Sequence, residues 1–113
     1  MSVQPGTYNI LLQRRASYSV LLQFKDSDDA VIDLTGYTAY AQVWNEGRTK
    51  KYADFAIAYT DRSNGQITIS LTDTQTATFI DDLRYDVLLE DGSENREYYL
   101  EGVITVSQGY TAP

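Results

Sequence analysis

The stretch from Asn64 to Leu71 reads NGQITISL and carries two signals of an antiparallel sheet. Asn-Gly is a preferred pair for the tight turn of a β-hairpin, because both residues tolerate a positive φ. The residues that follow alternate, so that Ile67, Ile69 and Leu71 share one side of an extended chain. The stretch therefore predicts a β-strand with one buried face, entered through a turn.

The same alternation returns along the rest of the chain. Runs of β-forming residues recur at intervals of roughly 10–15 residues, separated by clusters of Asp, Gly, Ser and Asn, as in sandwiches and barrels. The predicted strands are Thr7–Gln13, Ser17–Phe24, Tyr37–Asn45, Ala53–Thr60, Gln66–Leu71, Leu83–Glu90 and Glu97–Ser107. Each has one apolar and one mixed face, which is typical of two antiparallel sheets packed face to face. We predict an all-β, immunoglobulin-like antiparallel β-sandwich of about seven strands, with residues 1–113 forming a single domain.

One helical segment interrupts the strands. Thr72 and Gln75 have the spacing of a capping box, in which each side chain satisfies a free backbone N–H of the other residue. We expect one to two turns between the fifth and sixth strands, ending before Asp81. The next residues, 81–87 (DDLRYDV), resemble the tyrosine corner of immunoglobulin domains. In that corner the Tyr85 hydroxyl would bond back across the turn, and Val87 would stand where those domains have a cysteine.

Composition narrows the function classes. The 113 residues include no cysteine and no histidine, which removes thiol chemistry, disulfides and histidine-based catalysis. The net charge of −7 opposes binding to nucleic acid. No apolar run approaches the roughly 18 residues of a membrane span, and the N-terminus lacks the pattern of a signal peptide. We expect a soluble protein made in the cytoplasm, with no membrane contact, no cofactor and no enzymatic activity.

Two acidic groups are candidates for chemical sites. They are Asp26, Asp28, Asp29 and Asp33, and then Asp81, Asp82 and Asp86. Closely spaced carboxylates suit calcium, but the first group lacks the glycine and the closing glutamate of an EF-hand loop. A solvated hairpin tip explains the first group, and hydrogen bonds at a helix end and corner explain the second. No metal site is predicted. A carboxylate pair could hydrolyse glycosides only across a cleft, and a domain of this size offers little of one.

Aromatic residues on the third predicted strand suggest a binding surface. Tyr40 and Trp44 lie on the face opposite Ala39, Ala41 and Val43. If the small residues face the core, the aromatic side chains face outward, as they do in many protein interfaces. The alternative is an inverted strand with Trp44 in the core, where immunoglobulin domains bury a tryptophan. Tyr98 and Tyr99 cannot both face inward on a regular strand. The candidate interaction surface is Tyr40, Gln42, Trp44 and Tyr98.

Four longer segments carry a resemblance to a known family. They are the start of the chain (residues 8–15), VIDLTGYTAYAQV (residues 31–43), NGQITISLTDTQT (residues 64–76) and YDVLLEDGSENREYYLEGVITV (residues 85–106). Together they resemble the immunoglobulin-like N-terminal module of baseplate upper and tail proteins of tailed bacteriophages. The resemblance implies a virion protein of the tail, neck or baseplate, assembled in the host cytoplasm. Members often carry a receptor-binding region after this module, so a chain ending at Pro113 favours an adaptor, connector or decoration role.

The leading hypothesis is therefore a non-enzymatic virion structural protein. Its partners would be other virion proteins and copies of itself, bound through a sheet face or through the unpaired backbone groups of an edge strand. A small carbohydrate-binding module that stacks sugars on the same aromatic residues is the alternative. An enzyme that uses carboxylates is the third reading.

Overall fold

The computed structural model describes residues 6–26, 28–80, 82–93 and 95–108, so the predicted domain 1–113 extends past them at both ends. These residues form nine strands, one α-helix and one 3₁₀ turn. In chain order they are β1 (Gly6–Thr7), β2 (Ile10–Gln13), β3 (Tyr18–Gln23), β4 (Thr38–Asn45), β5 (Lys51–Asp54), β6 (Ala56–Asp61), the 3₁₀ turn η1 (Arg62–Asn64), β7 (Gln66–Leu71), α1 (Asp73–Thr76), β8 (Asp82–Glu90) and β9 (Arg96–Ser107).

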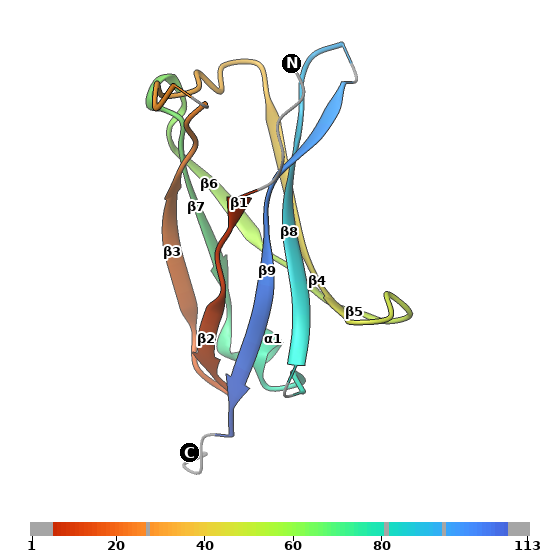
Figure 1. The fold of residues 1–113 in the computed structure, drawn as a ribbon. Coiled ribbons are helices and arrows are strands. Elements are labelled where there is room, and N and C mark those ends of the chain that lie inside the picture. The colour runs from red at the N-terminus through yellow and green to blue at the C-terminus, as the bar shows by residue number, and fades with distance from the viewer. Residues whose placement is uncertain (1–5, 27, 81, 94, 109–113) are drawn as a thin grey trace.

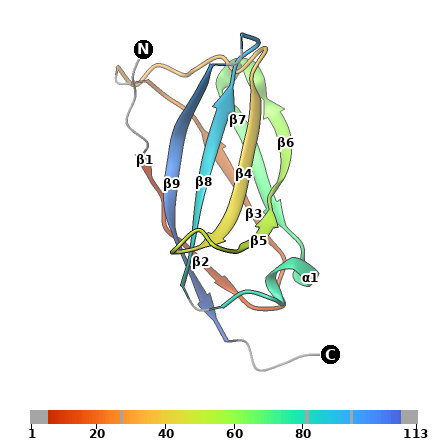
Figure 2. The same ribbon diagram turned by 90° about the vertical axis from the view of Figure 1, so that its right-hand side faces the viewer.

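The strands form two sheets packed face to face (Figures 1 and 2). One sheet has the order β9–β8–β4–β5, with β1 and β2 pairing along the free side of β9. The other has the order β3–β7–β6. These are the G–F–C and B–E–D orders of immunoglobulin domains, so the predicted immunoglobulin-like sandwich is confirmed. All pairings between these strands are antiparallel except those of β1 and β2, which run parallel to β9.

Two of the predicted strands are each divided into two. The first, Thr7–Gln13, is interrupted at Tyr8 and Asn9, which separate β1 from β2. The predicted strand Ala53–Thr60 changes sheet at Phe55, so that β5 pairs with β4 and β6 pairs with β7. Phe55 is buried between the sheets, and its backbone N–H bonds to the carbonyl of Ala41 at 2.9 Å. The chain bends there because this side chain enters the core.

The core is built from the inward faces of both sheets. Its fully buried side chains include Ile67 and Ile69 from β7, Leu83 and Val87 from β8, and Ile104 from β9. Burial of each such side chain stabilises the fold by about 1.5–3 kcal/mol relative to exposure. These residues are the alternating apolar positions of the sequence, so the predicted inward faces of these strands are confirmed.

The short helix α1 closes one end of the sandwich (Figure 2). The predicted capping box is present: Gln75 N–H donates to the Thr72 hydroxyl oxygen (3.1 Å), and Thr72 N–H donates to Gln75 Oε1 (2.8 Å). The fully buried Thr76 donates its hydroxyl to the carbonyl of Ala16 at 2.9 Å, which ties the helix to the turn before β3. The helix ends before residue 81, as predicted, and Asp81 lies outside the described residues.

The predicted tyrosine corner is wrong in its hydrogen bond. Tyr85 is buried, but its hydroxyl donates to the carbonyl of Tyr8, on the link between β1 and β2, and not back across its own turn. Gly102 makes this possible, because a Cβ at that position would lie 2.1 Å from the Tyr8 oxygen. Burial, followed by the nearby Tyr18 and Tyr8, raises the pKa of Tyr85 above its ordinary value. Val87 is fully buried at the position where immunoglobulin domains carry a cysteine.

Candidate functional site on the outer face of the larger sheet

The structure settles which way β4 faces. Ala39, Ala41 and Val43 are buried, whereas Tyr40 is 46% exposed and Trp44 is half-buried on the opposite face. The alternative in which Trp44 forms part of the core is therefore wrong, and the outward orientation is confirmed. On β9, Tyr98 is 52% exposed.

Tyr99 lies on the other side of β9 from Tyr98. It is half-buried and packs edge-on against Phe24, with ring centroids 6.0 Å apart. The expectation that Tyr98 and Tyr99 do not both face inward is thus confirmed. Burial, followed by a hydrogen bond with Glu97, raises the pKa of Tyr99 to about 12.

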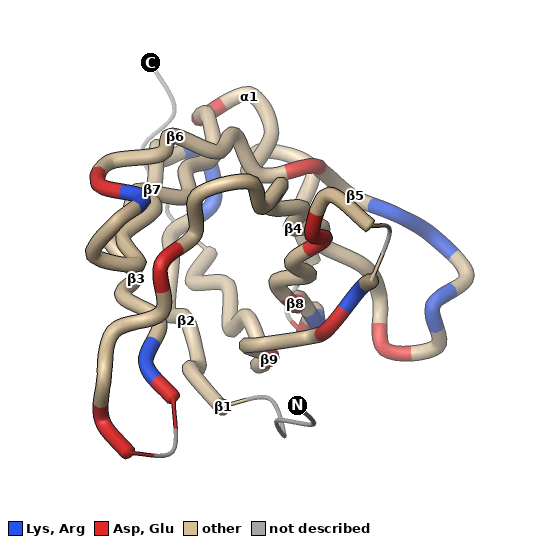
Figure 3. The backbone as a smooth tube through the Cα atoms, turned by 90° about the horizontal axis from the view of Figure 1, so that it is seen from above, with Lys and Arg blue, Asp and Glu red and all other residues tan. Residues whose placement is uncertain are grey.

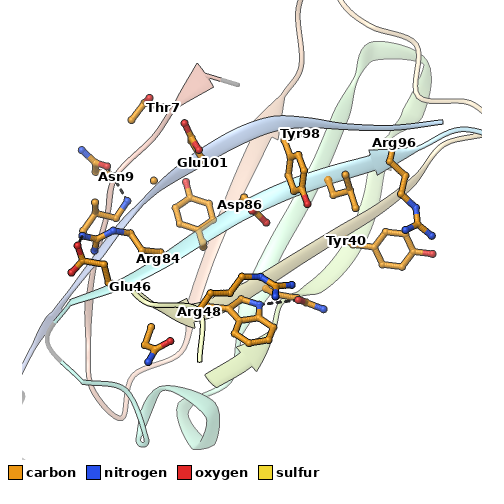
Figure 4. Close-up of a pocket in the computed structure, with 17 residues that line it drawn as sticks. Thr7, Asn9, Tyr40, Glu46, Arg48, Arg84, Asp86, Arg96, Tyr98 and Glu101 are labelled. Atoms are coloured by element: carbon orange, nitrogen blue, oxygen red, sulfur yellow. Dashed lines mark hydrogen bonds and ion pairs between the residues drawn. The ribbon is translucent and has the colours of Figure 1, made fainter. Parts of the chain in front are cut away.

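All four predicted surface residues line one hollow of about 850 Å³ (Figure 4). We call it the outer-face hollow. Its lining residues come mainly from β4, β8 and β9, with further contributions from the β4–β5 loop and the first strand. They are Thr7, Asn9, Tyr40, Gln42, Trp44, Asn45, Glu46, Arg48, Arg84, Tyr85, Asp86, Leu88, Arg96, Tyr98, Glu101, Gly102 and Val103. Sequence periodicity places Tyr40, Gln42 and Trp44 together on one face of their strand. Tyr98 joins them because the register of β9 against β8 shifts between Val87 and Leu88, which turns Tyr98 outward.

Strand register arranges the hollow in three parallel rows of side chains across β4, β8 and β9. The first row is Tyr40, Leu88 and Tyr98; the second is Gln42, Asp86 and Glu101; the third is Trp44, Arg84 and Val103. An apolar, mainly aromatic row therefore runs beside a row of carboxylates and an amide. Neighbouring side chains across such rows lie about 4.5–5.5 Å apart at Cβ.

Trp44 is held in place by polar contacts on two sides. Its indole N–H donates to Gln42 Oε1 at 2.9 Å, and the guanidinium carbon of Arg48 lies 4.5 Å from the ring centroid. A cation at this distance from an indole is attracted to the ring face. The Trp44 ring is thus fixed by Gln42, and Arg48 covers one of its faces.

Two arginines of the lining are paired with carboxylates. Arg84 Nη2 lies 3.5 Å from Glu46 Oε1, and Arg96 Nε donates to Glu90 Oε2. Neither arginine was predicted as a site residue, because ion pairs between strands or loops depend on register and loop path rather than on local sequence.

Asp86 and Glu101 have no such pairing. They lie directly opposite each other on β8 and β9, and within the described parts of the chain neither side chain has a hydrogen bond or an ion pair. Burial, and then the charge of Glu101, raises the pKa of Asp86, while Arg48 partly offsets the effect. The interpretation of Asp86 as a hydrogen-bonding residue of the corner is wrong, because the carboxylate faces outward into the hollow.

The acidic group near residue 26 is a turn in the structure. Asp26 Oδ1 accepts hydrogen bonds from the N–H groups of Asp28 (2.9 Å) and Ala30 (3.1 Å). Asp33 accepts from the hydroxyl and N–H of Thr35, which lower the pKa of this carboxyl. Among the described residues, no three metal-ligating side chains lie close enough to hold an ion. The carboxylates of Asp26 and Asp33 therefore accept hydrogen bonds from backbone N–H groups of their own turns.

The basic residues of the β4–β5 loop lie at one side of the molecule (Figure 3). Lys50 packs over the Tyr52 ring (4.8 Å to the centroid), and Lys51 pairs with Asp54 at 3.1 Å. At the other basic spot, Arg14 donates to the carbonyl of Phe79 at 2.9 Å. The basic side chains at the two spots are thus held by separate structural contacts.

In the described part of the chain, no helix has the length and apolar character needed to cross a membrane. No family model matches the sequence, and no curated protein matches it. Among solved structures, the chain is similar to the filamin domain of Lin-41, with 13% identity over 88% of this chain and 84% of that chain, and a TM-score of 0.49. The sandwich assignment rests on the strand pairing and the buried core described above.

Proposed function

We propose that the protein is a non-enzymatic structural module of a tailed-phage virion that binds other virion proteins through the outer-face hollow. The observation that carries the binding role is the exposure of Tyr40 and Tyr98 in the lining of a hollow that Trp44 also lines. Tyrosine and tryptophan are enriched in protein interfaces and in their energetically dominant positions. The virion setting is supported by the sequence resemblance over residues 8–106.

The arrangement of the carboxylates favours binding over catalysis. Asp86 and Glu101 stand side by side on one sheet face, whereas hydrolysis by a carboxylate pair requires the two groups to flank a scissile bond. The sequence also contains no histidine to act as a general base.

A carbohydrate-binding module is the second candidate. Exposed aromatic rings beside carboxylate and amide acceptors in one hollow are groups that could stack on a sugar and hydrogen-bond its hydroxyls. The stacking of Arg48 on Trp44 favours a protein partner instead, because a sugar would have to displace that guanidinium to use the same ring face.

Incorporation into particles tests the proposal. The tagged chain is expressed from the phage genome that encodes it, and purified virions are probed for the tag. Wild-type protein should be present, and the Tyr40→Ala/Tyr98→Ala variant should be absent although it folds. Leu21→Ala is the matched control, because Leu21 is 53% exposed on β3 in the opposite sheet.

Two outcomes would overturn the proposal. One is particles that lack the wild-type protein, and the other is normal incorporation of the double tyrosine variant. Saturable glycan binding that is lost in Trp44→Ala, without incorporation into particles, would establish the carbohydrate-binding alternative.

A further inference from the structure

The arginines that line the outer-face hollow make contacts within the protein, whereas two of its carboxylates lack a hydrogen bond and an ion pair in the part of the chain that the structure describes. Arg84 and Arg96 are paired with Glu46 and Glu90, and Arg48 is stacked on Trp44. Within the described residues the carboxylates of Asp86 and Glu101 have no hydrogen bond and no ion pair, although the charge of Arg48 attracts Asp86. Among the carboxylates that line the hollow, Glu46 is used by Arg84, and Asp86 and Glu101 remain available as charged acceptors.

The position of these two carboxylates is unfavourable for folding. Like charges directly opposite each other on neighbouring strands repel, and Asp86 and Glu101 occupy such a pair on β8 and β9. Burial and this repulsion together outweigh Arg48, since the pKa of Asp86 is raised. A cation placed between the carboxylates would remove the repulsion and supply the missing hydrogen-bond donors.

The row of side chains beside the two carboxylates is apolar and mainly aromatic. Tyr40, Leu88 and Tyr98 run parallel to the carboxylate row, one step along the strands. Lysine and arginine side chains place an alkyl stem on apolar surface and a charged head at a polar site. Aromatic rings also attract the cationic head. Figure 4 shows Tyr98 and Asp86 on the same side of the sheet, with Tyr40 and Arg96 farther along it.

We propose that the outer-face hollow receives a lysine or arginine side chain of a partner protein, with Asp86 and Glu101 as its acceptors. This inference rests on the proposed binding role of the same face. The occupant is identified by charge complementarity: an anionic group would meet two carboxylates, and a neutral one would leave their repulsion in place.

Binding of a model side chain provides the first test. Trp44 is the single tryptophan, so its fluorescence reports on the hollow when the full chain is titrated with acetyl-Gly-Arg-Gly-amide at constant ionic strength. The matched probe contains citrulline, a neutral analogue of arginine with nearly the same shape. We expect a saturable change with the arginine peptide. The citrulline peptide should bind at least about tenfold more weakly, since a hydrogen bond between charged groups contributes about 1.5–3 kcal/mol.

Variants then assign the acceptors. Asp86→Asn and Glu101→Gln should each weaken binding of the arginine peptide about tenfold, whereas Asp82→Asn should not. Asp82 is the matched control, because it is exposed on the same strand and does not line the hollow. Asp86→Asn should also raise the denaturation midpoint at pH 7, because the charged form is disfavoured in the folded state. A carboxylate with a purely structural role would instead lower the midpoint when replaced.

Equal responses to the arginine and citrulline peptides, or no response to either, would overturn this inference. So would unchanged arginine binding in Asp86→Asn and Glu101→Gln. Particle incorporation separates this failure from that of the proposed function. If the double tyrosine variant is excluded from virions but Asp86→Asn/Glu101→Gln is incorporated normally, the binding face stands and the cationic occupant is wrong.

Discussion

Replacing Gly102 with alanine tests how closely the first strand packs on the β8–β9 pair. The new Cβ would lie 2.1 Å from the Tyr8 oxygen and 2.9 Å from Cε1 of Tyr85. To reach an ordinary contact of 3.4 Å, the Tyr8 carbonyl would have to move by about 1.3 Å, the difference between 3.4 and 2.1. Well-packed interiors resist such shifts, which typically cost about 1–3 kcal/mol.

The displaced link between β1 and β2 would also lose hydrogen bonds. Three hold it in place: Tyr8 N–H to the Glu101 carbonyl (3.0 Å), Val103 N–H to Asn9 Oδ1 (3.0 Å), and the Tyr85 hydroxyl to the Tyr8 carbonyl. At about 1 kcal/mol each, their loss comes to about 3 kcal/mol. Together with the packing cost, we therefore expect Gly102→Ala to lower the free energy of unfolding by about 4–6 kcal/mol, which corresponds to a drop in Tm of about 15–30 °C.

Urea unfolding followed by circular dichroism measures this loss. Gly92→Ala is the matched control, because an added Cβ there meets no atom within 4 Å and should change stability by less than about 0.5 kcal/mol. Tyr85→Phe removes the hydroxyl without adding volume and should cost about 1–1.5 kcal/mol. A Gly102→Ala protein as stable as the wild type would refute the close packing of the first strand on Gly102.

Three further results are expected. Thr72→Ala should lower the unfolding free energy by about 1 kcal/mol through loss of the α1 capping box, and an unchanged urea midpoint would contradict this. Hydrogen bonds from Asn64, then Ser63, lower the pKa of Asp61 below its ordinary value of 3.8, so its stabilising effect is present above that pH and is lost as the pH falls through the lowered pKa. The stability difference between wild type and Asp61→Asn should accordingly shrink in acid, and a difference that grows would show the opposite sign. Acrylamide should quench the half-buried Trp44 of the native protein, and more so in Arg48→Ala, which uncovers one ring face; a native tryptophan that resists quenching would contradict its outward position.

Local sequence predicted most of the strands because their apolar residues alternate. Alternation over Gln66–Leu71 and Leu83–Glu90 predicts that each strand has one buried face, whichever sheet it joins. The apolar residues on those faces are buried in the structure. The change of sheet at Phe55 was not predictable in this way. Phe55 continues the apolar pattern of Ala53–Thr60, and only its insertion between the two sheets divides the run into β5 and β6.

Some residues of the site were likewise predictable from local sequence, and others were not. Tyr40, Gln42 and Trp44 were found because alternation places them opposite the small residues of the same strand, whereas the outward position of Tyr98 depends on the register shift between β8 and β9. Asp86 was interpreted as a hydrogen-bonding residue of the corner, and Glu101 was missed because it is not unusual within its own strand. Their significance arises from the register of β8 against β9, which sets two carboxylates opposite each other. Local sequence does not specify the register between strands whose residues are 15 positions apart.

The sequence by itself determined the fold class, the inward face of most strands and the capped helix, and it placed Tyr40 and Trp44 together on one face of their strand, opposite Ala39, Ala41 and Val43. These features follow from alternation, turn chemistry and capping, which act over a few neighbouring residues. The tertiary structure alone decided that Tyr85 bonds to Tyr8, that Gly102 must lack a side chain, and that three rows of side chains form one hollow. Each of these depends on contacts between segments far apart in the chain, which exist only after the sheets have assembled.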